Sequence, residues 1–175
     1  VLPRPWGHLH YRLRGPDHGL PVMFLNSLGT DLRMWEGVID RLPALRAVGM
    51  DKRGHGLSAT PTADWTLEDL AGDVLALADH LGLARFAVAG CSIGGMIGQR
   101  LATLAPDRIA GLFLSNTAMK VGTDASWAAR IASARLSSRA MWITGRPRSS
   151  SRARSRASKP SGAPPRRMRS LVMAA

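Results

Sequence analysis

The chain has 175 residues, the length of one domain, and carries a formal net charge of +12. Its single cysteine, Cys91, excludes an internal disulfide framework, and no run approaches the ~18 apolar residues of a membrane-spanning helix. The first residues lack the apolar stretch of a signal peptide. We therefore expect a cytoplasmic protein that does not insert into a membrane.

Strand and helix patterns alternate along the first part of the chain. Residues 8–13 alternate in polarity and predict a strand, and residues 21–25 form an apolar run typical of a strand buried on both faces. Apolar residues at helical spacing predict a helix over 33–42. A weaker strand is expected over 46–50.

The alternation continues with a second helix. Thr66, followed by two acidic residues, is typical of a helix N-cap, and Gly82 marks the end of that helix. Strands are predicted over 86–89 and 109–115, with a helix between them. We expect Asp69 and Asp73 on the solvated face of the second helix. Strands alternating with helices predict an α/β fold with a mostly parallel sheet and flanking helices.

A five-residue motif lies between the strand over 86–89 and the helix after it: Gly90-Cys91-Ser92-Ile93-Gly94. Gly-x-Ser-x-Gly between a strand and a helix is typical of the nucleophile elbow of a serine hydrolase. The tight turn presents the serine Oγ and aims a helix N-terminus at a developing oxyanion. The alternative is a glycine-rich connection in which Ser92 only caps the helix. Cys91 is expected to be a packed small residue.

Two further loops follow predicted strands. In this architecture the loop over 26–30 supplies one oxyanion N–H and the residue after the nucleophile supplies the other, which here are Leu28 and Ile93. In the loop over 51–58 we expect Asp51 and Arg53 to brace the backbone. His55 is a less favoured candidate base, because it lies in the wrong loop.

Histidines elsewhere give no catalytic or metal pattern. We expect surface or structural roles for the other four: His8, His10, His18 and His80. No metal-ligand spacing is present, so we expect no metal.

Four segments together resemble the 3-oxoadipate enol-lactonases, which are α/β-hydrolase-fold enzymes of bacterial aromatic catabolism. These segments are residues 25–35, 51–58, 90–99 and 114–118. The resemblance covers about residues 8–134. It implies hydrolysis of a small-molecule lactone, with Ser92 as the nucleophile, the Leu28 and Ile93 N–H groups as the oxyanion hole, and no cofactor. Because the family's substrate bears a carboxylate, Arg33 is a weak candidate for substrate binding. Trp127 is a second weak candidate, because it starts the region where this family's cap begins. Structural roles are the alternative for both.

The chain departs from this family after residue 134. Triad order in this fold is Ser, then Asp or Glu, then His, but the last acidic residue is Asp124 and the last histidine is His80. We therefore expect a truncated sheet and little or no lactonase activity.

Residues 135–175 hold 11 Lys and Arg and no acidic residue, whereas residues 1–134 hold 13 and all 12 Asp and Glu. This Arg, Ser and Pro-rich composition predicts a disordered basic tail. It also suggests a reading frame that shifts near residues 133–136, with a natural basic extension as the alternative.

Other functions remain open at this point. Within the same fold, an esterase or a C–C bond hydrolase is possible. A basic tail can bind nucleic acid, but this one lacks interleaved aromatic residues, so we expect no nucleic-acid partner. A non-functional remnant of a lactonase gene is the third alternative.

Overall fold

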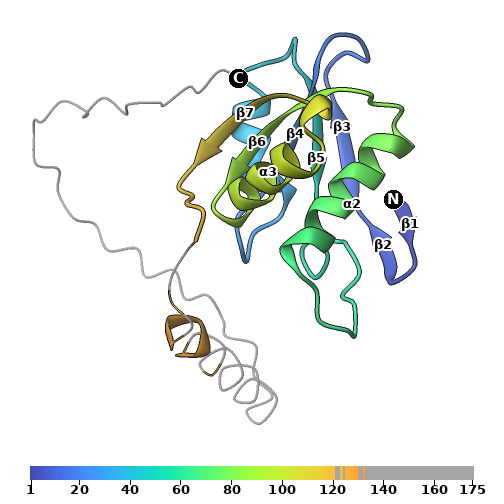
Figure 1. Ribbon diagram of the computed structural model, residues 1–175. Coiled ribbons are helices and arrows are strands. Elements are labelled where there is room, and N and C mark those ends of the chain that lie inside the picture. Colours follow the sequence, from blue (N-terminus) through green and yellow to red (C-terminus); the bar gives the residue numbers. More distant parts are fainter. Residues whose placement is uncertain (121–122, 124, 130–131, 133–175) are drawn as a thin grey trace, which may run out of the picture. The chain divides into compact units, whose positions relative to one another are not determined.

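The computed structural model describes residues 1–120, 123, 125–129 and 132 (Figure 1). The described residues up to Lys120 belong to one compact unit, and those from Thr123 onward belong to a second. The basic tail over 135–175 lies outside the described residues. Its disorder and the predicted boundary at residue 134 stay predictions.

Five strands of the first unit form one mostly parallel sheet, in the order β3-β5-β4-β6-β7 (Figure 1). The strands are β3 (Tyr11–Arg14), β4 (Pro21–Leu25), β5 (Arg46–Met50), β6 (Phe86–Cys91) and β7 (Ile109–Ser115). Only β3 runs antiparallel to its neighbour, β5, and the other three pairings are parallel. The predicted α/β class is confirmed.

The prediction of one continuous strand over residues 8–13 is wrong. The structure has β2 (Gly7–Leu9), which pairs with β1 (Leu2–Arg4) in a separate two-stranded sheet, and then β3 in the main sheet. The break falls at His10, whose N–H donates to Ser58 Oγ at 2.8 Å instead of to a neighbouring strand. A partner 48 residues away therefore divides a segment that local polarity predicts to be continuous.

The helical elements of the first unit differ in part from the predicted helices. The helix predicted over 33–42 is a 3-10 turn, η1 (Leu32–Trp35), and a short helix, α1 (Glu36–Ile39). The second helix, α2 (Leu67–His80), begins at Thr66 with a capping box in which Thr66 and Asp69 bond to each other's backbone. The third helix, α3 (Ile93–Leu104), follows the Gly-x-Ser-x-Gly motif, and the 3-10 turn η2 (Pro106–Arg108) precedes β7.

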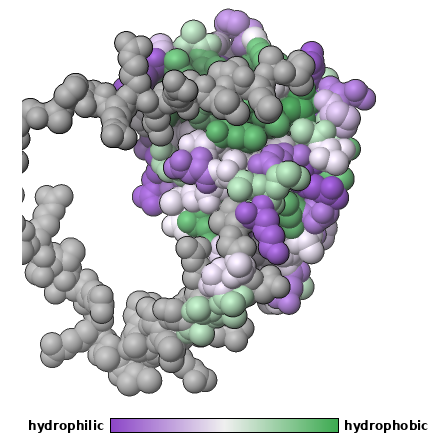
Figure 2. Space-filling model, turned by 60° about the vertical axis from the view of Figure 1, so that its left-hand side comes forward, coloured by the Kyte–Doolittle hydropathy of each residue, from purple (hydrophilic) through white to green (hydrophobic). Residues whose placement is uncertain are grey.

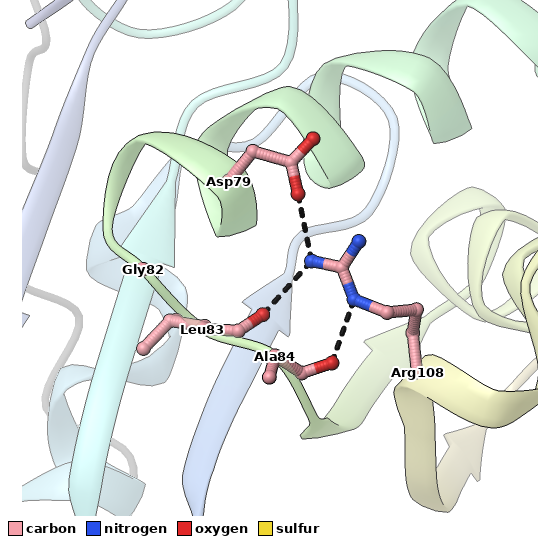
Figure 3. Close-up of a pocket in the computed structure, with 5 residues that line it drawn as sticks. All are labelled: Asp79, Gly82, Leu83, Ala84 and Arg108. Atoms are coloured by element: carbon pink, nitrogen blue, oxygen red, sulfur yellow. Dashed lines mark hydrogen bonds and ion pairs between the residues drawn. The ribbon is translucent and has the colours of Figure 1, made fainter.

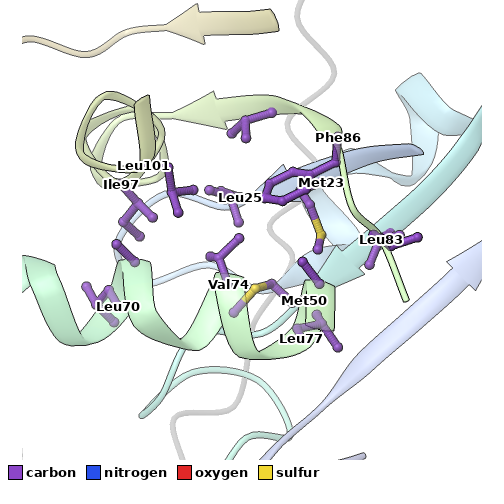
Figure 4. Packing of buried hydrophobic residues seen from close by; sticks show 14 of the residues in the cluster. Met23, Leu25, Met50, Leu70, Val74, Leu77, Leu83, Phe86, Ile97 and Leu101 are labelled. Atoms are coloured by element: carbon purple, nitrogen blue, oxygen red, sulfur yellow. The ribbon is translucent and has the colours of Figure 1, made fainter. Parts of the chain in front are cut away.

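Both faces of the sheet are covered, because successive strand residues point to opposite sides. On one face, Met23 and Leu25 of β4 join the main cluster with residues of α2 and α3, such as Val74 and Ile97 (Figure 4). On the other face, Phe24 packs against Trp35 and Ile39, with ring centroids of Phe24 and Trp35 5.2 Å apart. The sheet is therefore the rigid middle layer on which the loops after its strands are built.

The surface is mixed in character. Figure 2 shows one face of the molecule, on which hydrophobic residues reach the surface between hydrophilic ones. Phe113 and Leu114 of β7 are among the exposed hydrophobic residues. In the part of the chain that the structure describes, no helix is long and apolar enough to cross a membrane.

Arg108 occupies a shallow pocket beside the amino-terminal end of β6 (Figure 3). Its guanidinium donates to the carbonyl oxygens of Leu83 and Ala84 and to the carboxylate of Asp79, all at 2.7–2.8 Å. Arg108 thereby ties η2 to the end of α2 and to the connection that enters β6. The pocket lies at the opposite end of β6 from Ser92.

Candidate active site

The loops that follow β4, β5, β6 and β7 meet at the carboxyl edge of the parallel strands, which is where open α/β sheets bind ligands. Leu25 of β4 pairs with Gly90 of β6, so the loop over 26–30 starts beside the turn that carries Ser92. The loop over 51–58 contacts the same segment, because the Gly29 N–H donates to His55 Nε2 at 3.2 Å. Sequence-distant motifs thus come together at one edge.

Ser92 has the backbone of a strained elbow, with φ 55° and ψ −118°. A residue other than glycine in such a sparsely populated region costs about 1–3 kcal/mol and persists only when its surroundings impose it. Here the Ser92 N–H donates to the Ser115 carbonyl at 2.9 Å, and the Ser92 carbonyl accepts from the Gly95 N–H at 2.9 Å and from Thr117 Oγ1 at 2.7 Å. Neighbouring segments therefore fix the turn.

The glycines of the motif are required by close approach. A Cβ on Gly90 would overlap the Gly94 carbonyl, and a Cβ on Gly94 would overlap the carbonyl of Leu25. The elbow is therefore pressed against the end of β4, as the motif predicts.

The Ser92 side chain is not used as a helix cap. Ser92 stands at the N-cap position of α3, yet its side chain makes no capping hydrogen bond. The alternative reading of the motif, a serine that only caps a helix, therefore gains no support. Ile93 opens α3, so its backbone N–H is among the free donors at a helix N-terminus.

The loop over 26–30 is ordered by its own hydrogen bonds. The Asn26 side chain donates to the Thr30 carbonyl, and Thr30 Oγ1 donates to the Ser27 carbonyl at 2.9 Å. Leu28, at the tip of the loop, is 47% exposed. The loop presents this peptide at the same edge as Ser92.

Asp51 and Arg53 brace the loop over 51–58, as expected. The buried Asp51 carboxylate accepts from the Leu32 N–H at 2.8 Å, the Leu57 N–H at 3.0 Å and His10 Nδ1 at 2.9 Å. One carboxylate therefore connects three segments: the start of η1, the loop after β5 and the break between β2 and β3.

The expectation that Asp73 lies on a solvated helix face is wrong. Asp73 is fully buried and accepts two hydrogen bonds from Arg53, at 2.7 and 2.8 Å, and one from Arg4 at 3.2 Å. The Arg53 guanidinium also lies over the ring of Trp6, 4.6 Å from its centroid. Asp69 does lie at the surface, where it completes the cap with Thr66. Of the two aspartates, Asp73 therefore lies in the core and Asp69 at the surface.

His55 is engaged on both sides of its ring. Its Nδ1 lies 3.1 Å from the Arg53 carbonyl, which can only accept, so Nδ1 carries the proton and Nε2 accepts from the Gly29 N–H. Burial, assisted by the nearby Lys52 ammonium, lowers the pKa of His55. His55 is therefore a neutral histidine whose two ring nitrogens bind backbone groups of two loops. This structural role agrees with the sequence analysis, which does not favour His55 as the base.

The remaining histidines have structural or surface positions. His8 Nε2 contacts the Leu57 carbonyl at 3.0 Å, His80 contacts the Tyr11 hydroxyl at 3.2 Å, and His18 lies exposed beside Asp17. Among the described residues, Ser92 Oγ makes no hydrogen bond to a histidine, and no group of three or more His, Cys, Asp or Glu could hold a metal ion.

The two weak candidates for substrate binding lie apart in the chain. Arg33 is exposed and forms a two-point ion pair with Asp31, at 2.9 and 2.6 Å, which lowers the pKa of Asp31 to about 2. Trp127 belongs to the second unit, where its backbone N–H donates to the Thr123 carbonyl at 3.0 Å. Arg33 thus already has a partner of opposite charge.

Two residues at this edge escape prediction from the sequence. Lys52 is buried and donates to the carbonyls of Asn26 and Ser27 at 3.1 and 2.9 Å. Thr117 binds the Ser92 carbonyl. The only indication in the sequence is position: each residue lies two places after the end of a strand, in a segment that resembles the family.

Comparison with known proteins agrees with this geometry. The chain is 38% identical to 3-oxoadipate enol-lactonase 2 of Acinetobacter baylyi, in an alignment that covers 70% of this chain and 46% of that protein. It is 31% identical to lipase LipV of Mycobacterium tuberculosis, in an alignment that covers 74% of this chain and 49% of that protein. The crystal structure of the enol-lactonase from Burkholderia xenovorans LB400 superposes with a TM-score of 0.70 at 43% identity, over 73% of this chain and 50% of that one. The chain thus spans about half the length of these relatives. Residues 21–156 match the model of the alpha/beta hydrolase fold, and the chain belongs to that family.

Proposed function

We propose that this chain carries the nucleophile and the oxyanion-binding part of a carboxylic-ester or lactone hydrolase, with an enol-lactone such as that of 3-oxoadipate as the favoured substrate. The observation that carries the proposal is the strained backbone of Ser92 at the carboxyl edge of the sheet, next to the loop over 26–30. The likeness to two enol-lactonases supports the substrate class.

The chemistry is acyl transfer to water. Ser92 Oγ attacks the carbonyl carbon of the lactone, and its proton passes to a base. The N–H groups of Leu28 and Ile93 stabilise the negative charge that develops on the carbonyl oxygen, each contributing about 3–4 kcal/mol. The ring oxygen then leaves with a proton, and water releases the acid from the acyl-serine. Arg33 and Trp127 are proposed to contact the substrate, and the reaction needs no cofactor.

The base is the part that these 175 residues lack. No histidine follows Ser92 in the sequence, and His55 is bound to two backbone groups. We therefore expect the polypeptide, tested alone, to acylate slowly and to turn over little. Sites without a triad member keep a residual rate enhancement of about 10³–10⁴ over water, from oxyanion binding and substrate positioning.

The test is covalent labelling with a fluorophosphonate, read by mass spectrometry of the labelled peptide. We expect the label on Ser92 and its loss in Ser92→Ala. Cys91→Ala is the matched control, because it removes the neighbouring thiol and should keep the label. A label that survives Ser92→Ala would overturn the assignment, and near-normal lactone turnover by the wild-type chain would overturn the expected low activity.

A simple esterase is the second candidate, favoured by the likeness to lipase LipV. Acylation by p-nitrophenyl acetate, compared with opening of the enol-lactone, separates the two. Faster reaction with the aryl ester than with the lactone would favour the esterase.

A further inference from the structure

Lys52 is a buried cation without a carboxylate partner among the described residues. Its side chain is 1% exposed, and it forms no ion pair within 4.0 Å in that part of the chain. Instead, Nζ donates to the carbonyls of Asn26 and Ser27, at 3.1 and 2.9 Å. A buried charge destabilises a protein unless hydrogen bonds compensate it, and here the two carbonyls of the loop over 26–30 provide that compensation. The position of a lysine at this point of the core therefore suggests a role in this loop.

The contact with Ser27 fixes the direction of the next N–H. The Ser27 carbonyl and the Leu28 N–H belong to the same peptide group, and in a planar trans peptide these two bonds point in opposite directions. The carbonyl is turned toward buried Lys52, so the Leu28 N–H is turned away from it. Thr30 Oγ1 donates to the same carbonyl at 2.9 Å, which further restricts rotation of this peptide.

The following peptide group is fixed from another side. The Gly29 N–H donates to His55 Nε2 at 3.2 Å, so the peptide between Leu28 and Gly29 cannot rotate freely. The Leu28 N–H therefore belongs to one restrained peptide group and is followed by a second one, and each group is bound by a side chain of the loop after β5.

We propose that Lys52 is a positioning residue of the oxyanion hole, which aims the Leu28 N–H by holding the Ser27 carbonyl. Its effect on the chemistry depends on the proposed function of Ser92, whereas its effect on the loop does not. An oxyanion donor is effective only when it is preorganised, since a peptide that can rotate must be ordered during the reaction.

The charge of Lys52 responds to pH in an accessible range. Burial lowers its pKa to about 8, against the opposing attraction of Asp51 and Asp31. The pKa values of Asp31 and His55 are both lowered, so neither group changes its charge near pH 8. The free cysteine Cys91 ends β6 at the same edge, so the assignment of a loop titration to Lys52 rests on its disappearance when Lys52 is replaced.

The experiment is a pH titration of the full chain by amide ¹⁵N–¹H NMR between pH 6.5 and 9.5, with Lys52→Met and Lys120→Met as variants. We expect the Leu28 resonance to titrate with a midpoint near 8 in wild type and in Lys120→Met, which changes an exposed lysine. In Lys52→Met the titration should disappear. A Leu28 resonance that is flat in wild type, or that titrates equally in Lys52→Met, would overturn the proposal.

Fluorophosphonate labelling at pH 7 measures the consequence for Ser92. We expect Lys52→Met to slow labelling by at least about 10-fold. Removal of an oxyanion donor slows a reaction by about 10²–10³-fold, and a donor that is present but misdirected should cost less. Equal labelling rates would overturn the catalytic consequence. Absence of labelling in wild type would overturn the proposed function of Ser92, and the NMR titration would still decide whether Lys52 positions the loop.

Discussion

The side chain of Thr117 fixes the backbone of Ser92, since Thr117 Oγ1 donates a 2.7 Å hydrogen bond to the Ser92 carbonyl oxygen. The Ser92 N–H donates to the Ser115 carbonyl at 2.9 Å. Both peptide groups of the candidate nucleophile are therefore bound by the segment at the end of β7. That segment imposes the φ of 55°, which a serine would not adopt unaided.

Thr117→Val should destabilise the fold by about 0.5–1.5 kcal/mol, because it removes one partly buried hydrogen bond while conserving shape. Urea denaturation followed by circular dichroism measures the change. Thr117→Ser keeps the hydroxyl and should restore most of the hydrogen-bond energy. If Thr117→Val matches wild type while Thr117→Ser is destabilised, the hydroxyl contributes nothing and the methyl group, which lies close to Gly95, provides the stabilisation.

Gly94→Ala should be far more damaging than the same change elsewhere. A Cβ at position 94 would overlap the Leu25 backbone, which belongs to the central strand β4 and cannot move aside cheaply. We expect a loss of more than about 3 kcal/mol, or no folding.

Gly72→Ala is the matched control for Gly94→Ala. Gly72 lies inside α2 and has open space around its Cβ position, so alanine should stabilise the fold by about 1 kcal/mol. Similar melting temperatures for the two variants would contradict the packing of the elbow against β4.

Local sequence patterns predict the elements whose stabilising contacts are local. The capping box of Thr66 and Asp69, and the buried row of Leu70, Val74 and Leu77, define α2 from within one segment. The pattern over 33–42 misleads, because Val38 and Leu42 remain 43% and 48% exposed while the helix ends at Ile39. Apolar spacing cannot distinguish a buried face from an exposed one.

The same distinction separates the site residues. Ser92 is recognisable from its motif because the elbow needs glycines adjacent in sequence. Lys52 and Thr117 are not recognisable, because their partners Ser27 and Ser92 lie 25 residues away in each case. Asp73 is misassigned for the same reason, since its partner Arg53 comes from a different loop.

Asp73→Asn should destabilise the fold by about 3–5 kcal/mol. The change leaves Arg53, a buried cation, without its carboxylate, and breaking a buried pair costs more than the pair contributes when intact. Urea denaturation measures the effect. Asp64→Asn, at an exposed position, is the matched control and should stay within about 0.5 kcal/mol of wild type. A loss below about 1 kcal/mol for Asp73→Asn would mean that Arg53 finds water or another partner.

Stability should rise with pH above 8 because of Lys52. Its pKa falls from 10.5 to about 8 on folding, so between these values the unfolded chain binds a proton that the folded chain has released. The free energy of unfolding therefore increases through this window, and the cost of burying the charge is fully present below pH 8. The whole gain is about 3 kcal/mol.

Comparison of wild type with Lys52→Met isolates this contribution, because His55, whose pKa Lys52 helps to lower, is neutral throughout the pH range tested. Urea denaturation at pH 7.5, 8.5 and 9.5 should show wild-type stability rising relative to Lys52→Met at each step. Lys120→Met should follow wild type at every pH. A constant difference between wild type and Lys52→Met would mean that Lys52 keeps an ordinary pKa in the fold, and that water reaches its ammonium group.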